Sequence, residues 1–172
     1  MAESELMTEH HFYLFGYVVH QYARIESGLN FYIADSLGID IIAAEIITKP
    51  YSSRDFRNVV RALLSLDARV EMEDELKRLL GEFKAIGRIR NLIAHSRWKA
   101  GDRPNSIKPT GLQIRNDKLE FVGMEKDDDD YTIEELEALG VRTEKLHTDF
   151  VNFFKRHKLS LFGEQTSDDT EE

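Results

Sequence analysis

Three polar residues near the middle of the chain, Arg90, Asn91 and His95, have the types and spacing that chemistry at a phosphate group requires. Arginine offers a fork of donors that matches phosphate oxygens, and histidine can move a proton near neutral pH. Asparagine can hold a hydroxyl or phosphate oxygen by hydrogen bonds. In RNA the 2′-OH beside each phosphate is itself a nucleophile. An Arg that stabilises the charged phosphorane and a His that manages the proton would therefore suffice for cleavage, with no metal and no other cofactor.

The spacing of these residues on a helix decides whether one copy of the chain can use them together. Asn91 and His95 are four residues apart and share one face. Arg90 lies about 140° around the axis from His95, so one straight helix does not aim both at one small target. Two copies packed about a two-fold axis would bring both pairs to a shared cleft. We therefore expect a homodimer with a composite site.

Basic and aromatic residues flank this motif. Arg88, Arg97 and Lys99 lie close to it in a stretch without acidic residues, and we expect them to bind the substrate. Trp98 can stack on a base, as aromatic side chains do in RNA sites. Trp98 can equally anchor the end of its helix against a hairpin, and both interpretations stay open.

A structural interpretation of the same residues also stays open. Arg90 can form an ion pair with a carboxylate at the edge of the core, such as Glu26. His95 can cap the C-terminal end of a helix, where the helix dipole favours a cation. A run of charges is most often a solvated helix face.

Apolar residues recur every three or four positions before the motif, which is typical of amphipathic helices. The first such pattern includes Phe12 and predicts a helix of about 30 residues that ends near Gly38. A short apolar segment follows over residues 41–47. Ser52 and Asp55 then give a capping signal for a third helix.

The third and fourth helices are predicted from the same periodicity. The inward face of the third is expected to run as far as Leu66. The fourth, which carries the motif, is expected to start near Val70 and to end around Trp98–Gly101, because Gly101 and then Pro104 are stop signals.

The pattern changes after the motif. Apolar and polar residues alternate on both sides of residues 116–117, which predicts a β-hairpin over about 107–122. Residues 127–130 are four aspartates and are expected to form an exposed loop. Thr132 and Glu135 have the spacing of a capping box that opens a last helix. The fold class is therefore all-α, a bundle of four to five helices with a small β-hairpin before the last one.

The composition fits one globular domain. The chain has 172 residues, of which 41% are hydrophobic, and it contains no cysteine, which excludes disulfides and cysteine-ligated metal sites. We expect one helical domain over residues 1–162 and an acidic disordered tail over 163–172. No apolar run is long enough to span a membrane, and the acidic start is unlike a signal peptide, so we expect a cytoplasmic protein with no membrane partner.

The formal charge of −9 is unevenly distributed. Residues 1–50 carry a net charge of −5, residues 51–122 carry +5, and residues 123–172 carry −9. The total argues against nucleic acid as a partner, because phosphate binding needs basic groups. The candidate site lies in the basic middle segment, so the charge does not exclude RNA.

The segment Arg90-Asn91-Leu92-Ile93-Ala94-His95 resembles the R-x4-6-H signature of HEPN domains, an all-helical family of RNases and nucleotide-binding modules. The long first helix, with Glu26 at a position similar to the family's acidic residue, adds to the likeness. The helix order covers roughly residues 5–160. The hairpin departs from the minimal bundle of the family, and Ile89 precedes the arginine where a polar residue would be expected.

The resemblance implies a homodimer whose paired motifs form the active cleft. Arg90 would hold the phosphate, His95 would move the proton, Asn91 would position it, and the product would carry a 2′,3′-cyclic phosphate. Many members act in toxin–antitoxin or antiviral systems, so an antitoxin or another protein partner is implied. Others have lost catalysis.

Three hypotheses follow for this chain. The first is a metal-independent endoribonuclease of HEPN type. The second is a non-catalytic HEPN module that binds a nucleotide, RNA or a partner protein. The third is a structural helical dimer whose acidic tail contacts a basic partner.

Overall fold

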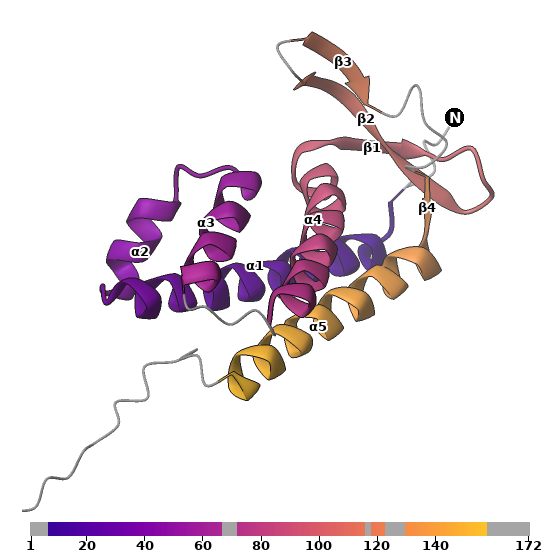
Figure 1. The fold of residues 1–172 in the computed structure, drawn as a ribbon. Coiled ribbons are helices and arrows are strands. Elements are labelled where there is room, and N and C mark those ends of the chain that lie inside the picture. Colours follow the sequence, from indigo (N-terminus) through magenta and orange to yellow (C-terminus); the bar gives the residue numbers. More distant parts are fainter. Residues whose placement is uncertain (1–6, 67–71, 116–117, 123–129, 158–172) are drawn as a thin grey trace, which may run out of the picture. The chain divides into compact units, whose positions relative to one another are not determined.

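A computed structural model of the chain describes residues 7–66, 72–115, 118–122 and 130–157. In this part of the chain there are five helices, and the predicted fold class, helical with a small β insertion before the last helix, is confirmed (Figure 1). The helices are α1 (Glu9–Leu37), α2 (Ile41–Thr48), α3 (Ser53–Leu66), α4 (Glu73–His95) and α5 (Ile133–Arg156).

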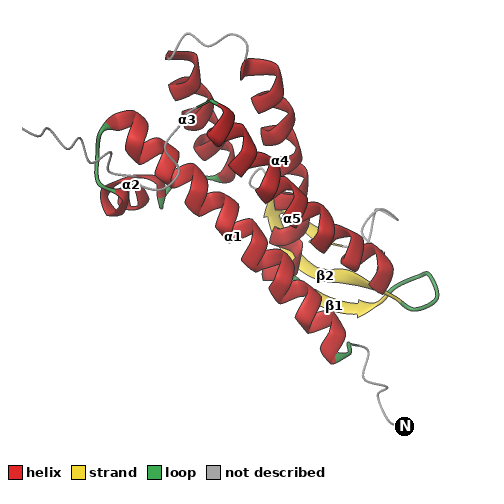
Figure 2. Ribbon diagram, turned by 90° about the horizontal axis from the view of Figure 1, so that it is seen from below, coloured by secondary structure: helices red, strands yellow, loops and turns green. Residues whose placement is uncertain are grey.

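The β insertion is larger than predicted. The predicted hairpin is present as β2 (Ser106–Arg115) and β3 (Lys118–Val122), which pair antiparallel with Leu112 opposite Phe121. Two strands were not predicted, β1 (Arg97–Ala100) and β4 (Tyr131–Thr132), and both pair antiparallel with β2. Figure 2 shows β1 and β2 side by side.

The chain divides into two compact units, each of which is described by itself. The first unit comprises residues 1–23 and 81–147, and the second comprises residues 24–80 and 148–172. The helices α1, α4 and α5 therefore each contribute one part to each unit. The sheet belongs to the first unit, whereas α2 and α3 belong to the second.

The second unit has a core of apolar side chains from five helices, including Leu29, Val60 and Leu79, which are fully buried. Its helices begin and end where the sequence signals them. Gly38, with φ of 61°, closes α1, and the amide of Ile39 donates to the carbonyl of Ala34 over 3.0 Å, as in a Schellman motif.

The helix starts of the second unit are capped by side chains. The Asp40 carboxylate accepts from the amide of Ile42 over 2.8 Å at the start of α2. The predicted capping signal of α3 is confirmed, because the amide of Asp55 donates to the Ser52 hydroxyl over 3.2 Å. The prediction for Leu66 was wrong: its side chain is 80% exposed, because it lies about 160° around the helix axis from the buried Leu64.

The first unit buries one face of its sheet against α1 and α5. Leu14 and Phe15 of α1 form a buried cluster with Ile107, Tyr131 and Leu136. The side chain that precedes this cluster on α1, Phe12, is 61% exposed, contrary to the inward position predicted for it. Phe12 lies about 120° around the helix axis from the fully buried Val18, so it falls outside the buried face of α1.

The predicted capping box of α5 is confirmed. The amide of Thr132 donates to the Glu135 carboxylate over 2.9 Å, and the amide of Glu135 donates back to the Thr132 hydroxyl over 3.4 Å. The predicted exposed loop at residues 127–130 was wrong at its last member, because Asp130 is buried, whereas residues 127–129 lie outside the described residues.

Asp130 is buried because it organises the turn between β1 and β2. One of its carboxylate oxygens accepts from the amides of Asp102 and Arg103, over 2.8 and 2.9 Å. Burial opposes ionisation of Asp130, but hydrogen bonds from Ser106 and from these two amides, with the charge of Arg103, outweigh it and lower the pKa of the carboxyl. The same turn leaves no room for a side chain at Gly101, because a Cβ there would lie 1.9 Å from the Ser106 hydroxyl.

Several predictions fall on residues outside the described part of the chain. These are the start of α4 near Val70, the turn at residues 116–117 and the acidic tail at 163–172. Within the described residues, no helix is long and apolar enough to cross a membrane.

Candidate functional site

The helix that carries the motif ends earlier than predicted, and this places His95 at its last position. The sequence predicted an end around Trp98–Gly101, but α4 stops at His95 and β1 begins at Arg97. The reason is the pairing of β1 with β2, in which Trp98 lies opposite Pro109. In the strand, the Trp98 side chain points inward. If α4 continued as far as Trp98, this residue could not pair with Pro109.

Arg90 is half-buried and is held in place by an aromatic ring. Its guanidinium carbon lies 4.8 Å from the centre of the Tyr22 ring, which is a cation–π contact. Tyr22 is in turn stacked on Phe83, with ring centres 4.4 Å apart and planes 5° apart. Tyr22 and Phe83 are both buried, so the platform beneath the guanidinium is part of the core of the first unit.

The platform requires a glycine on α4. A Cβ at Gly87 would lie 2.5 Å from the hydroxyl oxygen of Tyr22, closer than such atoms approach. Gly87 therefore lets the Tyr22 ring lie close against α4, one turn before Arg90. Tyr22 could not be singled out from the sequence, because its contact with Arg90 is long-range and leaves no local pattern.

Arg90 and Asn91 are joined by a hydrogen bond. The guanidinium of Arg90 donates from Nη1 to the Oδ1 of Asn91 over 3.1 Å. Because the Oδ1 of Asn91 accepts this bond, its Nδ2 remains available to donate to another group. Together with the Tyr22 ring, it restricts the long arginine side chain to one region of space, and such preorganisation lowers the cost of binding an anion.

Asn91 and His95 lie on the exposed side of α4, whereas Arg90 lies on its flank. Residues 88, 91 and 95 have helical spacings of three and four, so Arg88 shares the exposed face with Asn91 and His95. The structure thus joins Arg90 to Asn91 by a hydrogen bond and places Asn91 and His95 on the same exposed face of α4. It leaves Arg90 and His95 pointing in different directions from one helix, as the sequence predicts.

The flanking residues fall on two sides of β1. Arg97 and Lys99 are exposed, and Trp98 between them is half-buried. The Trp98 ring packs on Phe15, with ring centres 4.7 Å apart, and near Tyr131 at 6.1 Å. This geometry favours the anchoring interpretation of Trp98, because its ring is turned toward the core cluster rather than toward the exposed face.

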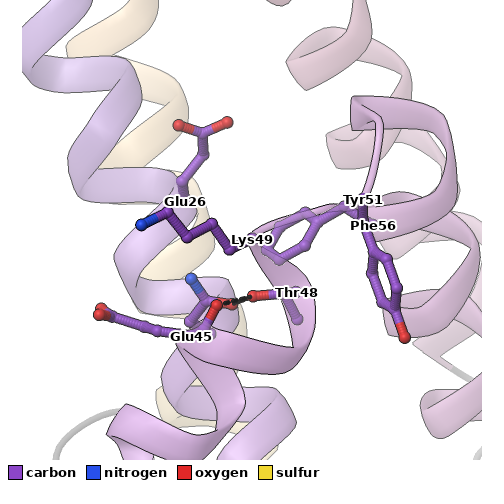
Figure 3. A pocket seen from close by; sticks show the side chains of 7 residues that line it. Glu26, Glu45, Thr48, Lys49, Tyr51 and Phe56 are labelled. Atoms are coloured by element: carbon purple, nitrogen blue, oxygen red, sulfur yellow. Dashed lines mark hydrogen bonds between the residues drawn. The ribbon is translucent and has the colours of Figure 1, made fainter.

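Glu26 belongs to the second unit and lines a pocket there. The pocket has a volume of about 370 Å³ and lies among residues of α1, α2 and the start of α3 (Figure 3). At its base the buried Thr48 hydroxyl donates to the Asn30 Oδ1 over 2.8 Å. Two carboxylates, Glu26 and Glu45, share the pocket with the single cation Lys49, so the charged groups of its lining are negative on balance.

The charged groups around Arg103, in the turn between β1 and β2, are paired with one another. The Arg103 guanidinium donates from Nη1 to Glu135 over 2.8 Å and also contacts Asp130. The hydrogen bond from Arg103 lowers the pKa of the Glu135 carboxyl. Among the described residues, no three His, Asp or Glu side chains are grouped so that they could hold a metal ion.

Comparisons of the chain with models of protein families, with curated proteins and with solved structures found no match.

Proposed function

We propose that this chain is a metal-independent endoribonuclease of HEPN type, in which Arg90, Asn91 and His95 act on the RNA backbone. One observation carries the proposal: the end of α4 combines a guanidinium fixed by Tyr22 and Asn91 with an exposed histidine at the last position of the helix. A fixed arginine suits a phosphate, and an accessible histidine suits proton transfer.

The proposed reaction is attack of the substrate's own 2′-oxygen on the neighbouring phosphorus. His95 accepts the proton of the 2′-OH, the bond from the 2′-oxygen to phosphorus forms, and the bond from phosphorus to the 5′-oxygen breaks. The leaving 5′-oxygen takes up a proton from water, and His95 then returns its proton to the solvent. Arg90 stabilises the charge that develops on the phosphorane, and Asn91 orients the phosphate. The products are a 2′,3′-cyclic phosphate and a 5′-OH.

The site needs two copies of the chain. Arg90 points to the flank of α4 whereas His95 is on its exposed side, so we place the arginine of one copy and the histidine of the other at one phosphate. The partner copy thus contributes a residue to each site, and a symmetric dimer contains two such sites. The resemblance to HEPN proteins extends the proposal to a cytoplasmic toxin–antitoxin or antiviral system with a protein antitoxin.

The test is cleavage of RNA in the presence of EDTA. Single-stranded and structured RNA are incubated with the purified protein, with Arg90→Ala and with His95→Ala, and the new ends are identified by mass. We expect the wild type alone to cut and to leave 2′,3′-cyclic phosphate ends. Equal cutting by all three proteins, or no cutting of any RNA by the wild type, contradicts the proposal. Circular dichroism checks that both variants are folded.

A second candidate, a non-catalytic HEPN module, is favoured by the contacts of Arg90 within its own unit. Its guanidinium already lies on Tyr22 and bonds Asn91, so its role can be to hold α4 against α1. This candidate predicts RNA or nucleotide binding without cleavage. It also predicts that Arg90→Ala lowers the free energy of unfolding while His95→Ala does not.

A further inference from the structure

The exposed face of α4 and the outer face of β1 together carry a row of cations on both sides of His95. We call Lys84, Arg88, Arg97 and Lys99 the basic stripe; all four are exposed. Residues 83–101 contain no acidic residue. The stripe lies entirely within the first unit.

Helical spacing aligns the first half of the stripe with the motif. Residues 84, 88, 91 and 95 are separated by four, three and four positions, so their side chains form one row along α4. The row rises about 16 Å from Lys84 to His95 at 1.5 Å per residue. It excludes Arg90, which lies on the flank of the helix.

The second half of the basic stripe lies on one face of β1, because side chains along a strand alternate between its two faces. Arg97 and Lys99 point to one face of β1, and Trp98 points to the core on the other. Lys99 lies opposite Lys108 of β2, and Arg97 opposite Thr110, so no carboxylate lies directly opposite these two cations. Lys108 forms an ion pair with Asp102, which marks the acidic end of the face.

The two halves are contiguous. Arg97 is two residues beyond His95, so their Cα atoms are at most about 7 Å apart. Neither Arg97 nor Lys99 has an ion-pair partner among the described residues. Cations without partners on an exposed surface fit a polyanion, because binding releases the polyanion's condensed counterions.

We infer that the substrate of the site is a single RNA strand whose phosphates follow the basic stripe, from Lys84 across His95 to Lys99. This inference rests on the proposed function. A single strand is favoured over a duplex because the 2′-oxygen must align with phosphorus and the leaving 5′-oxygen, and the A-form helix does not allow that alignment.

Binding is measured separately from cleavage with a 2′-O-methyl RNA strand of 12 nucleotides, which lacks the 2′-OH nucleophile. Fluorescence anisotropy gives the binding constant at several salt concentrations. The wild type is compared with Arg97→Gln/Lys99→Gln and with a control of equal charge, Arg61→Gln/Lys77→Gln, at exposed helix positions of the second unit. A duplex of the same sequence is measured in parallel.

We expect the Arg97→Gln/Lys99→Gln variant to bind more weakly, with a plot of log K against log salt less steep by about 1.4, since each single-strand phosphate contact contributes about 0.7. The control variant should match the wild type. The inference is overturned if the two variants bind alike, if the duplex binds more tightly than the single strand, or if the wild type binds neither. If the wild type binds the single strand through the basic stripe but does not cut RNA, the proposed reaction is refuted and the inference about binding stands.

Discussion

At the scale of single residues, the account depends on how the Arg90 side chain is held. The guanidinium lies on the ring of Tyr22, which is stacked on Phe83, and it bonds to Asn91. A long side chain fixed in this way loses less conformational entropy when it binds a phosphate. Tyr22 should therefore act as a positioning residue for cleavage.

Replacing the ring tests this role. Tyr22→Leu removes the cation–π contact, which is worth roughly 0.5–2 kcal/mol, so we expect RNA cleavage to slow by about 2- to 30-fold. Tyr22→Phe retains the ring and should cut at close to the wild-type rate. The measurement is the single-turnover rate in EDTA, with the folded fraction of each variant checked by thermal unfolding. Equal rates for the two variants contradict a positioning role.

The residues of the site were predictable in part. Arg90, Asn91 and His95 were placed on the fourth helix from the periodicity of the sequence, and the structure puts all three there. Tyr22 and Gly87 could not be found in this way. Both matter because of a contact between α1 and α4. The sequence around each residue shows only the pattern of its own helix, so it does not reveal this contact.

At the scale of elements, the turn between β1 and β2 decides where α4 can end. Asp130 accepts the amides of Asp102 and Arg103, and it thereby joins the turn to β4 and the start of α5. If the turn is held, β1 stays paired with β2 and Trp98 stays against Phe15. The position of His95 thus depends on a carboxylate far along the chain.

The pKa of Asp130 determines how its contribution to the stability of the fold changes with pH. Burial raises it, but the hydrogen bonds and Arg103 lower it more, so the folded-state pKa lies below the ordinary value. Asp130 therefore stabilises the fold at neutral pH, and this contribution is lost as the pH falls through the lowered pKa. Asp130→Ala should lower the free energy of unfolding at pH 7 by about 1–3 kcal/mol.

Thermal unfolding at pH 7 and pH 3 measures the effect. We expect the difference in stability between the wild type and Asp130→Ala to be large at pH 7 and smaller at pH 3. Asp102→Ala, in the same turn, is the control, because its exposed ion pair with Lys108 is worth under about 1 kcal/mol. A constant difference at both pH values would show that the ionised carboxylate is not the stabilising form.

The turn also requires a residue without a side chain at position 101. A Cβ there would lie 1.9 Å from the Ser106 hydroxyl and 2.1 Å from the Asp130 carboxylate. We expect Gly101→Ala to lower the free energy of unfolding by about 1–3 kcal/mol, as overpacking does. Chemical denaturation measures it, and an unchanged midpoint would contradict this packing.

The elements were largely predictable where their signals are local. The first and last helices and the hairpin followed from periodicity and capping residues, including Thr132 with Glu135. The strands β1 and β4 were missed because each is too short to give a pattern of its own, and each is held by its pairing with β2. The early end of α4 was missed for the same reason.

At the scale of the whole molecule, the charge distribution and the number of copies matter most. The net charge of −9 is concentrated at the two ends, and the motif and the basic stripe lie in the basic segment. We expect the acidic residues 163–172 to compete with RNA for that segment. Truncation after Phe162 should raise the affinity for single-stranded RNA at low salt, and an unchanged affinity in the anisotropy assay would contradict this competition.

The central claim, a site that combines Arg90 of one copy with His95 of another, is tested most directly by mixing two inactive variants. Arg90→Ala and His95→Ala are unfolded together, refolded at equal concentrations and assayed for RNA cleavage in EDTA. Half of the dimers should then contain one variant of each kind, and each of these retains one intact site. The account predicts recovery of about a quarter of the wild-type activity. A mixture that stays as inactive as each variant alone would contradict it.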